Sequence, residues 1–203
     1  MPRLALLLAL LLTAGCTGSP DTRGPFPAGD DLVRAAATSF ASVRSVHFAA
    51  GVNGVLPGFP LRQIEGDATL DDGGRATGTA DVQDGDGHTK FPFDVQDSQQ
   101  PPYPVQAFLG PHGGLKRLLD GVADAKTEGR ENVDGAPALR VAGRVPAAVA
   151  HSVLAAVDAD LNVKVWVADD GGPRRFVRLW VQIPPPDNHL SPVMIELSLT
   201  EQA

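Results

Sequence analysis

The last part of the chain alternates regularly between apolar and polar residues. Three apolar rows with a period of two follow one another: Leu161, Val163, Val165 and Val167; Val177, Leu179, Val181 and Ile183; and Val193, Ile195, Leu197 and Leu199. This period is typical of strands that bury one face. Short turn-forming stretches at 169–173 and 184–192 join the segments. We therefore predict antiparallel strands with one covered face and one largely wet face.

Earlier segments extend the predicted sheet. Val46, Phe48, Ala50 and Val52 alternate with small or polar residues, and further strands are predicted at 64–70, 75–83, 88–96, 126–133 and 137–145. The last two flank Asp134-Gly135, a strong hairpin signal. The strands between 64 and 96 contain few branched apolar residues, so their strand signal is the weakest.

Helical spacing occurs in three places. Leu32, Ala36, Phe40 and Val43 predict a helix over 31–44, with Asp30 or Asp31 able to cap its N-terminus. Leu115, Leu118, Leu119 and Val122 predict a short helix that ends near Gly121. Pro146 is suited to open a helix that runs to about Val157. These helices carry small and medium apolar residues that can cover the sheet.

The N-terminus has the pattern of a bacterial lipoprotein signal. Arg3 precedes the leucine-rich run 4–12, which is too short to span a bilayer, and small residues lead to Cys16. We expect cleavage before Cys16 and lipidation of its thiol, which would anchor the protein at the outer face of the cytoplasmic membrane. Thr13 departs from the aliphatic residue usual at that position. The alternative is an ordinary secreted protein with an incidental free cysteine.

The chain is predicted to consist of three parts. Residues 1–15 form the signal peptide, residues 16–29 form a tether rich in proline and glycine, and residues 30–203 form one domain. With one cysteine the domain cannot contain an internal disulfide, so its stability depends on its core. The excess of arginine over lysine, with abundant alanine, glycine and proline, fits a GC-rich actinobacterial source.

Charge and motifs exclude several classes of function. The net charge of −7 argues against nucleic-acid binding, because phosphate contacts need clustered basic residues. No phosphate loop, nucleophile elbow or complete calcium loop is present. The five histidines have no pair at ligand spacing: His47, His88, His112, His151 and His189. We therefore expect no metal, no cofactor, no catalytic residues and no enzyme.

Four short motifs carry a family resemblance. They are a Gly-x-x-x-Leu-Leu-x-Gly helix at 114–121, the Val-Asp-Gly turn at 133–135, the Gly-x-Val-Pro helix entry at 143–146 and the Val-Trp-Val-Ala-x-Asp-Gly strand end at 165–171. Each motif is weak alone. In this order, behind a lipoprotein signal, they resemble the LppX/LprG (LppX_LprAFG) family of mycobacterial and actinobacterial cell-envelope lipoproteins.

The resemblance implies a fold and a function. The implied fold is α+β, with a single strongly curved antiparallel sheet, a half-open barrel, and helices on its concave face, LolA/LppX-like. An apolar gap between sheet and helices would take acyl chains of an acylated envelope lipid or glycolipid and carry or present them for transport. Family members are regarded as lipid carriers, some working with a major facilitator exporter.

Apolar residues near loops are the candidates for lining or gating such a gap: Phe48, Val52, Leu56, Phe59, Phe108, Leu115, Leu118 and Leu119. Each of them could equally be ordinary core. Two alternatives stay open for the whole protein. The same apolar rows could close into a solid core, which would leave a surface lipoprotein that acts as a protein-interaction or structural module. An enzyme acting on envelope material is the third hypothesis.

Overall fold

The computed structural model describes residues 24–71, 74–85, 87–96, 105–185 and 191–203. The predicted signal segment, Cys16, the first part of the tether and His189 lie outside the described residues. No helix among the residues described is long and apolar enough to cross a membrane.

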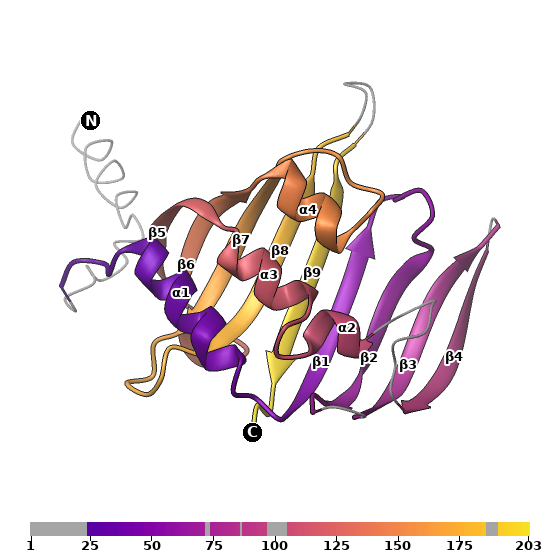
Figure 1. Cartoon of the computed structure of the whole chain (residues 1–203), viewed down its shortest axis with the longest axis horizontal. Coiled ribbons are helices and arrows are strands. Elements are labelled where there is room, and N and C mark those ends of the chain that lie inside the picture. The colour runs from indigo at the N-terminus through magenta and orange to yellow at the C-terminus, as the bar shows by residue number, and fades with distance from the viewer. Residues whose placement is uncertain (1–23, 72–73, 86, 97–104, 186–190) are drawn as a thin grey trace, which may run out of the picture.

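A single sheet of nine antiparallel strands forms the body of the described domain (Figure 1). Its order is β4-β3-β2-β1-β9-β8-β7-β6-β5, so β4 and β5 form the two ends and the sheet does not close on itself. The strands are β1 (Ser45–Asn53), β2 (Leu61–Thr69), β3 (Arg75–Asp84), β4 (Gly87–Gln96), β5 (Ala123–Val133), β6 (Ala136–Val145), β7 (Leu161–Ala168), β8 (Phe176–Ile183) and β9 (Val193–Thr200). The predicted curved antiparallel sheet is confirmed.

The helices of the described residues all lie on one face of this sheet (Figure 1). They are α1 (Gly29–Phe40), α2 (Val105–Leu109), α3 (Gly114–Asp120) and α4 (Ala147–Val153). The predicted placement is confirmed, and α2 was not predicted. Five residues are too few to show a helical period, and α2 is therefore invisible to a pattern search.

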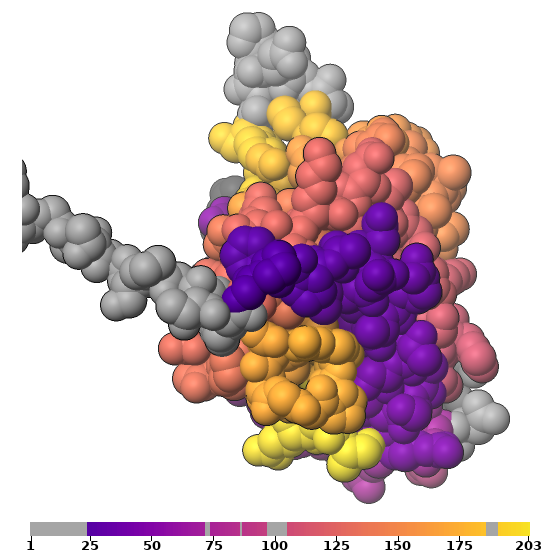
Figure 2. All heavy atoms as spheres, turned by 90° about the vertical axis from the view of Figure 1, so that its left-hand side faces the viewer, coloured from indigo at the N-terminus to yellow at the C-terminus, as the bar shows by residue number. Residues whose placement is uncertain are grey.

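Helix α1 differs at both ends from the prediction. It begins at Gly29, Ala28 occupies the cap position, and neither Asp30 nor Asp31 caps it; both lie in its first turn. A Cβ on Gly29 would lie 2.6 Å from the Ala125 carbonyl carbon, so close packing against β5 sets the start. Its other end is at Phe40, where the chain turns into β1. Figure 2 shows α1, in indigo, lying across this end of the molecule.

The core lies between the helices and the inner face of the sheet. Phe40 of α1 and Phe176 of β8 are fully buried and meet with ring centroids 6.3 Å apart. Phe176, and not Val177 as predicted, begins the buried row of β8. The pairing of β7 with β8 shifts between Trp166 and Val167, which moves the buried position by one residue. Helix α4 also stops at Val153, four residues before its predicted end.

The segment before α1 lies along the edge strand β5. Thr127 Oγ1 donates to the Pro27 carbonyl at 2.7 Å, and the Arg130 guanidinium lies over the Phe26 ring, 5.0 Å from its centroid. Arg130 also pairs with Asp169 at 3.1 Å, and both side chains are largely buried, with 8% and 14% exposed. These contacts join the start of the domain to its β5 end.

Candidate functional site

An apolar cavity of about 260 Å³ lies between the sheet and the helices α2, α3 and α4. Its volume is several times the roughly 30 Å³ that one water molecule occupies in the liquid. The lining residues are Phe48, Ala50, Val52, Phe59, Leu61, Ile64, Val105, Ala107, Phe108, Leu109, Gly114, Arg117, Leu118, Val153, Leu154, Leu179, Val181, Ile195 and Leu197. Every member of this set except Arg117 is glycine or has a hydrocarbon side chain.

The alternation of β1 builds the floor of the cavity. Phe48, Ala50 and Val52 are two residues apart, so their side chains lie on the helix-covered face of the sheet. The neighbouring strands add Ile64 from β2 and Leu197 from β9, which are the cross-strand partners of Ala50. Since Ala50 is small, the centre of this floor leaves space that a larger residue would occupy.

Two faces of α3 serve different purposes. Gly114, Arg117 and Leu118 are spaced at i, i+3 and i+4, lie on one side of the helix and line the cavity. Leu115 and Leu119 lie on another side, are almost fully buried and do not line it. One face of α3 therefore lines the cavity, and another face packs into the core.

The structure brings together five of the eight sequence candidates. Phe48, Val52, Phe59, Phe108 and Leu118 line the cavity, and Leu56, Leu115 and Leu119 do not. Leu56 is buried in the β1–β2 loop, where its carbonyl accepts a hydrogen bond from the Phe59 amide at 3.0 Å. It supports the loop that carries Phe59 and has no place on the cavity wall.

Several wall residues were not among the sequence candidates. Val105, Ala107 and Leu109 come from the unpredicted helix α2, and Val153 and Leu154 from the end of α4. The apolar side of the predicted helix after Pro146 contained Val153 and Leu154, so the pattern carried a signal for these two. No pattern in the sequence indicates α2.

The cavity reaches the surface between the helices and the β1–β2 loop. Its wall residues Phe59, Phe108, Val153 and Leu154 are half-buried, and Ala107 and Arg117 are exposed. A wall with no carboxylate, hydroxyl, thiol or imidazole provides no acid, base or nucleophile. Within the described part of the chain there is also no group of three His, Cys, Asp or Glu side chains that could hold a metal ion. This arrangement can bind hydrocarbon.

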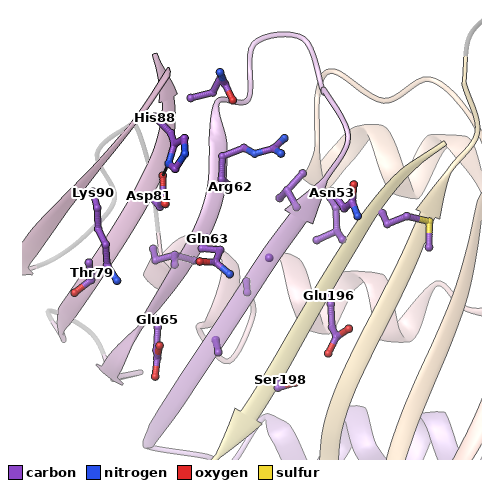
Figure 3. Close-up of a pocket in the computed structure, with 18 of the residues that line it drawn as sticks. Asn53, Arg62, Gln63, Glu65, Thr79, Asp81, His88, Lys90, Glu196 and Ser198 are labelled. Carbon is purple, nitrogen blue, oxygen red and sulfur yellow. Dashed lines mark hydrogen bonds and ion pairs between the residues drawn. The ribbon is translucent and has the colours of Figure 1, made fainter. Parts of the chain in front are cut away.

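A second and larger hollow, of about 880 Å³, lies on the opposite face of the sheet (Figure 3). Its wall mixes apolar residues, such as Trp180, Met194 and Ile195, with many polar and charged ones: Asn53, Arg62, Gln63, Glu65, Thr79, Asp81, His88, Lys90, Glu196 and Ser198. His88 Nδ1 lies 3.2 Å from Asp81 Oδ1 within it. Burying hydrocarbon against these charged groups would remove them from water at a cost, so this hollow suits acyl chains less well than the cavity beneath the helices does.

Comparison with known proteins places the fold and the family. The LppX_LprAFG lipoprotein profile matches residues 28–101 and 94–203. The chain is 31% identical over 186 residues to the lipoarabinomannan carrier protein LprG of Mycolicibacterium smegmatis, covering 81% of this chain and 79% of that protein. LprG of Mycobacterium tuberculosis H37Rv is 30% identical, covering 82% of this chain and 78% of that protein.

Two crystal structures share the architecture. LprF of Mycobacterium bovis superposes with a TM-score of 0.69 at 19% identity, covering 86% of this chain and 92% of that one. LppX of Mycobacterium tuberculosis superposes with a TM-score of 0.61 at 18% identity, covering 85% and 93%. The four motifs, the open curved sheet and the matching profile agree: the chain belongs to the LppX_LprAFG lipoprotein family.

Proposed function

We propose that this protein binds the acyl chains of cell-envelope lipids in its apolar cavity and carries or presents those lipids for transport. The observation that supports this most strongly is the hydrocarbon wall beneath α2, α3 and α4, in a member of a family whose relatives are named lipoarabinomannan carriers. A domain that served only as a protein-interaction module would need no such unfilled space.

The free energy of binding would come from moving the acyl chains of the lipid out of water. Each methylene group moved from water into an apolar site gains about 0.8 kcal/mol, so a chain of modest length can be held without a charged contact. The half-buried residues at the mouth, Phe59 and Phe108, would cover the part of the chain that enters last. The role is that of a binding protein without catalysis.

The cellular setting of the proposal depends on the N-terminus. Lipidated Cys16 would hold the domain at the outer face of the cytoplasmic membrane, where envelope lipids emerge. The domain would extract a lipid there, shield its tails and release it to an acceptor membrane or an exporter of the major facilitator class. Replacing Cys16 by serine should release the protein from the membrane fraction.

The proposal can be tested by replacing a small residue on the floor of the cavity with a large one. Purified full-length protein with Cys16→Ser, delipidated, is titrated with a fluorescent fatty acid. The Ala50→Phe variant should bind at least about tenfold more weakly, since a benzyl group would occupy the space that the chain needs. Ala49→Phe is the matched control. Ala49 precedes Ala50 in the chain, but it is exposed and lines the second hollow on the opposite face of the sheet.

Thermal unfolding checks that both variants remain folded. If Ala50→Phe does not fold, Val153→Phe narrows the same cavity from α4. The proposal would be wrong if the parent protein takes up no lipid and purifies without extractable lipid. Equal binding by the Ala49 and Ala50 variants would place the lipid somewhere other than in this cavity.

A further inference from the structure

Arg117 is the only ionisable residue on the cavity wall among the described residues. It comes from the middle of α3 and lies on the same side of the helix as Gly114 and Leu118. The residue is exposed although it lines the cavity. An arginine in this situation places its methylene groups along the apolar wall and its guanidinium in water. The positive charge therefore lies at the mouth.

No described residue forms a hydrogen bond or ion pair with the Arg117 side chain. The nearest acid along the helix, Asp120, is paired with Lys116, whose Nζ lies 2.5 Å from Asp120 Oδ2. His112, in the loop before α3, is exposed and has no carboxylate to offer. The guanidinium thus has five donors and no acceptor among the residues that the structure describes.

We propose that Arg117 is a selectivity residue, which makes the cavity prefer an acyl lipid with a phosphate ester at the junction of chain and head group over a neutral lipid with the same chain. This inference rests on the proposed function. A chain in the cavity would bring its polar junction to the mouth, where the guanidinium fork can donate two parallel hydrogen bonds to phosphate oxygens. Water surrounds the mouth, so the effect on affinity is moderate.

The choice of a phosphate follows from complementarity at the mouth. Phe59, Phe108, Val153 and Leu154 frame the opening and offer no donor or acceptor from their side chains. A neutral hydroxyl or ester group would therefore find one partner at most, whereas an anion gains the charge of Arg117 as well. The apolar frame also lowers the local dielectric, which strengthens that attraction compared with a fully solvated pair.

The test compares two ligands with one chain. Dodecyl phosphate and dodecanol, each below its aggregation concentration, are titrated into delipidated full-length protein with Cys16→Ser by calorimetry. The parent protein should bind dodecyl phosphate about fivefold more tightly, and higher salt should reduce this ratio. Arg117→Gln should bind both ligands equally well, and Arg117→Lys should keep part of the preference.

Arg34→Gln is the control for net charge. It removes the same charge from an exposed position on α1, where Arg34 pairs with Asp31 at 2.8 Å, and it should leave the ratio unchanged. Millimolar inorganic phosphate, which has no chain, should displace neither ligand. Displacement of dodecyl phosphate alone would indicate a site for free anions and would overturn the assignment to a lipid head group.

The ratio and the absolute affinities answer different questions. Binding of dodecanol by the parent protein tests the proposed function. If the parent protein binds neither dodecanol nor dodecyl phosphate, the proposed function is wrong. Binding of both ligands with equal affinity would leave the carrier function standing and overturn the role of Arg117. A preference for dodecyl phosphate that persists in Arg117→Gln would likewise overturn the role of Arg117.

Discussion

Gly66 of β2 and Gly78 of β3 are direct cross-strand partners whose backbones approach closely on the helix-covered side of the sheet. A Cβ on Gly66 would lie 2.9 Å from Gly78 Cα, and a Cβ on Gly78 would lie 2.7 Å from Gly66 Cα. Neighbouring inward positions hold Ala68, Ala76 and Ala80, all buried. Small residues on one face let the strands bend toward that face, so this pair marks where the sheet curls.

Replacing Gly78 by alanine should therefore destabilise the domain by about 2 kcal/mol, because the added methyl group meets backbone that cannot move aside. Gly129→Ala in β5 is the matched control, since no atom lies within 4 Å of its Cβ position. It should change stability by less than about 0.5 kcal/mol. Urea unfolding of both variants measures the difference, and equal stabilities would show that the close approach does not matter.

Leu115 and Leu118 lie on different faces of α3, so replacing each of them by alanine should have different consequences. Leu115→Ala should cost about 2–5 kcal/mol of stability, because Leu115 is fully buried and away from the cavity. Leu118→Ala should cost less, since part of this side chain already faces unfilled space, and should shift lipid preference toward longer or bulkier chains. Denaturant unfolding and a series of fatty acids of increasing length test both expectations. A shift in chain preference in Leu115→Ala would contradict the assignment of faces.

The Asp169 carboxylate should stabilise the β5 end of the domain to an extent that depends on pH. Burial raises the pKa of Asp169, but hydrogen bonds and attraction from Arg174 and Arg130 outweigh burial and lower the pKa below its ordinary value of 3.8. A lowered folded-state pKa means that the unfolded chain binds the proton more tightly. The stabilisation is therefore complete above about pH 3.8 and is lost as the pH falls through the folded-state pKa.

Asp169→Asn should lower the free energy of unfolding at neutral pH by about 3 kcal/mol, because it removes the carboxylate charge that pairs with the largely buried Arg130 and with Arg174. The variant should also lose less stability than the parent protein between pH 4 and pH 2 (roughly the range in which aspartates titrate). Asp31→Asn, which breaks an exposed pair with Arg34, is the control and should change little. Parallel acid unfolding curves for the parent and Asp169→Asn would refute this account.

The local pattern predicted most of the elements and missed those that depend on distant contacts. Asp134-Gly135 joins β5 and β6 as predicted, because a two-residue turn needs only its own backbone geometry. The start of α1 depends on Ala125, nearly a hundred residues away, and the buried row of β8 depends on a register shift against β7. The weak strand signal between 64 and 96 has its explanation in the curl: alanine and glycine face inward there.

The sequence by itself determined the antiparallel strands, the helices α1, α3 and α4, and the family, because alternation, turn residues and short motifs are local properties of the chain. It also proposed eight apolar residues for the site without distinguishing wall from core. Only the tertiary structure decided that Leu118 lines the cavity and Leu115 does not, and that Arg117 stands at the mouth. Whether a side chain faces filled or empty space depends on segments that meet only after folding.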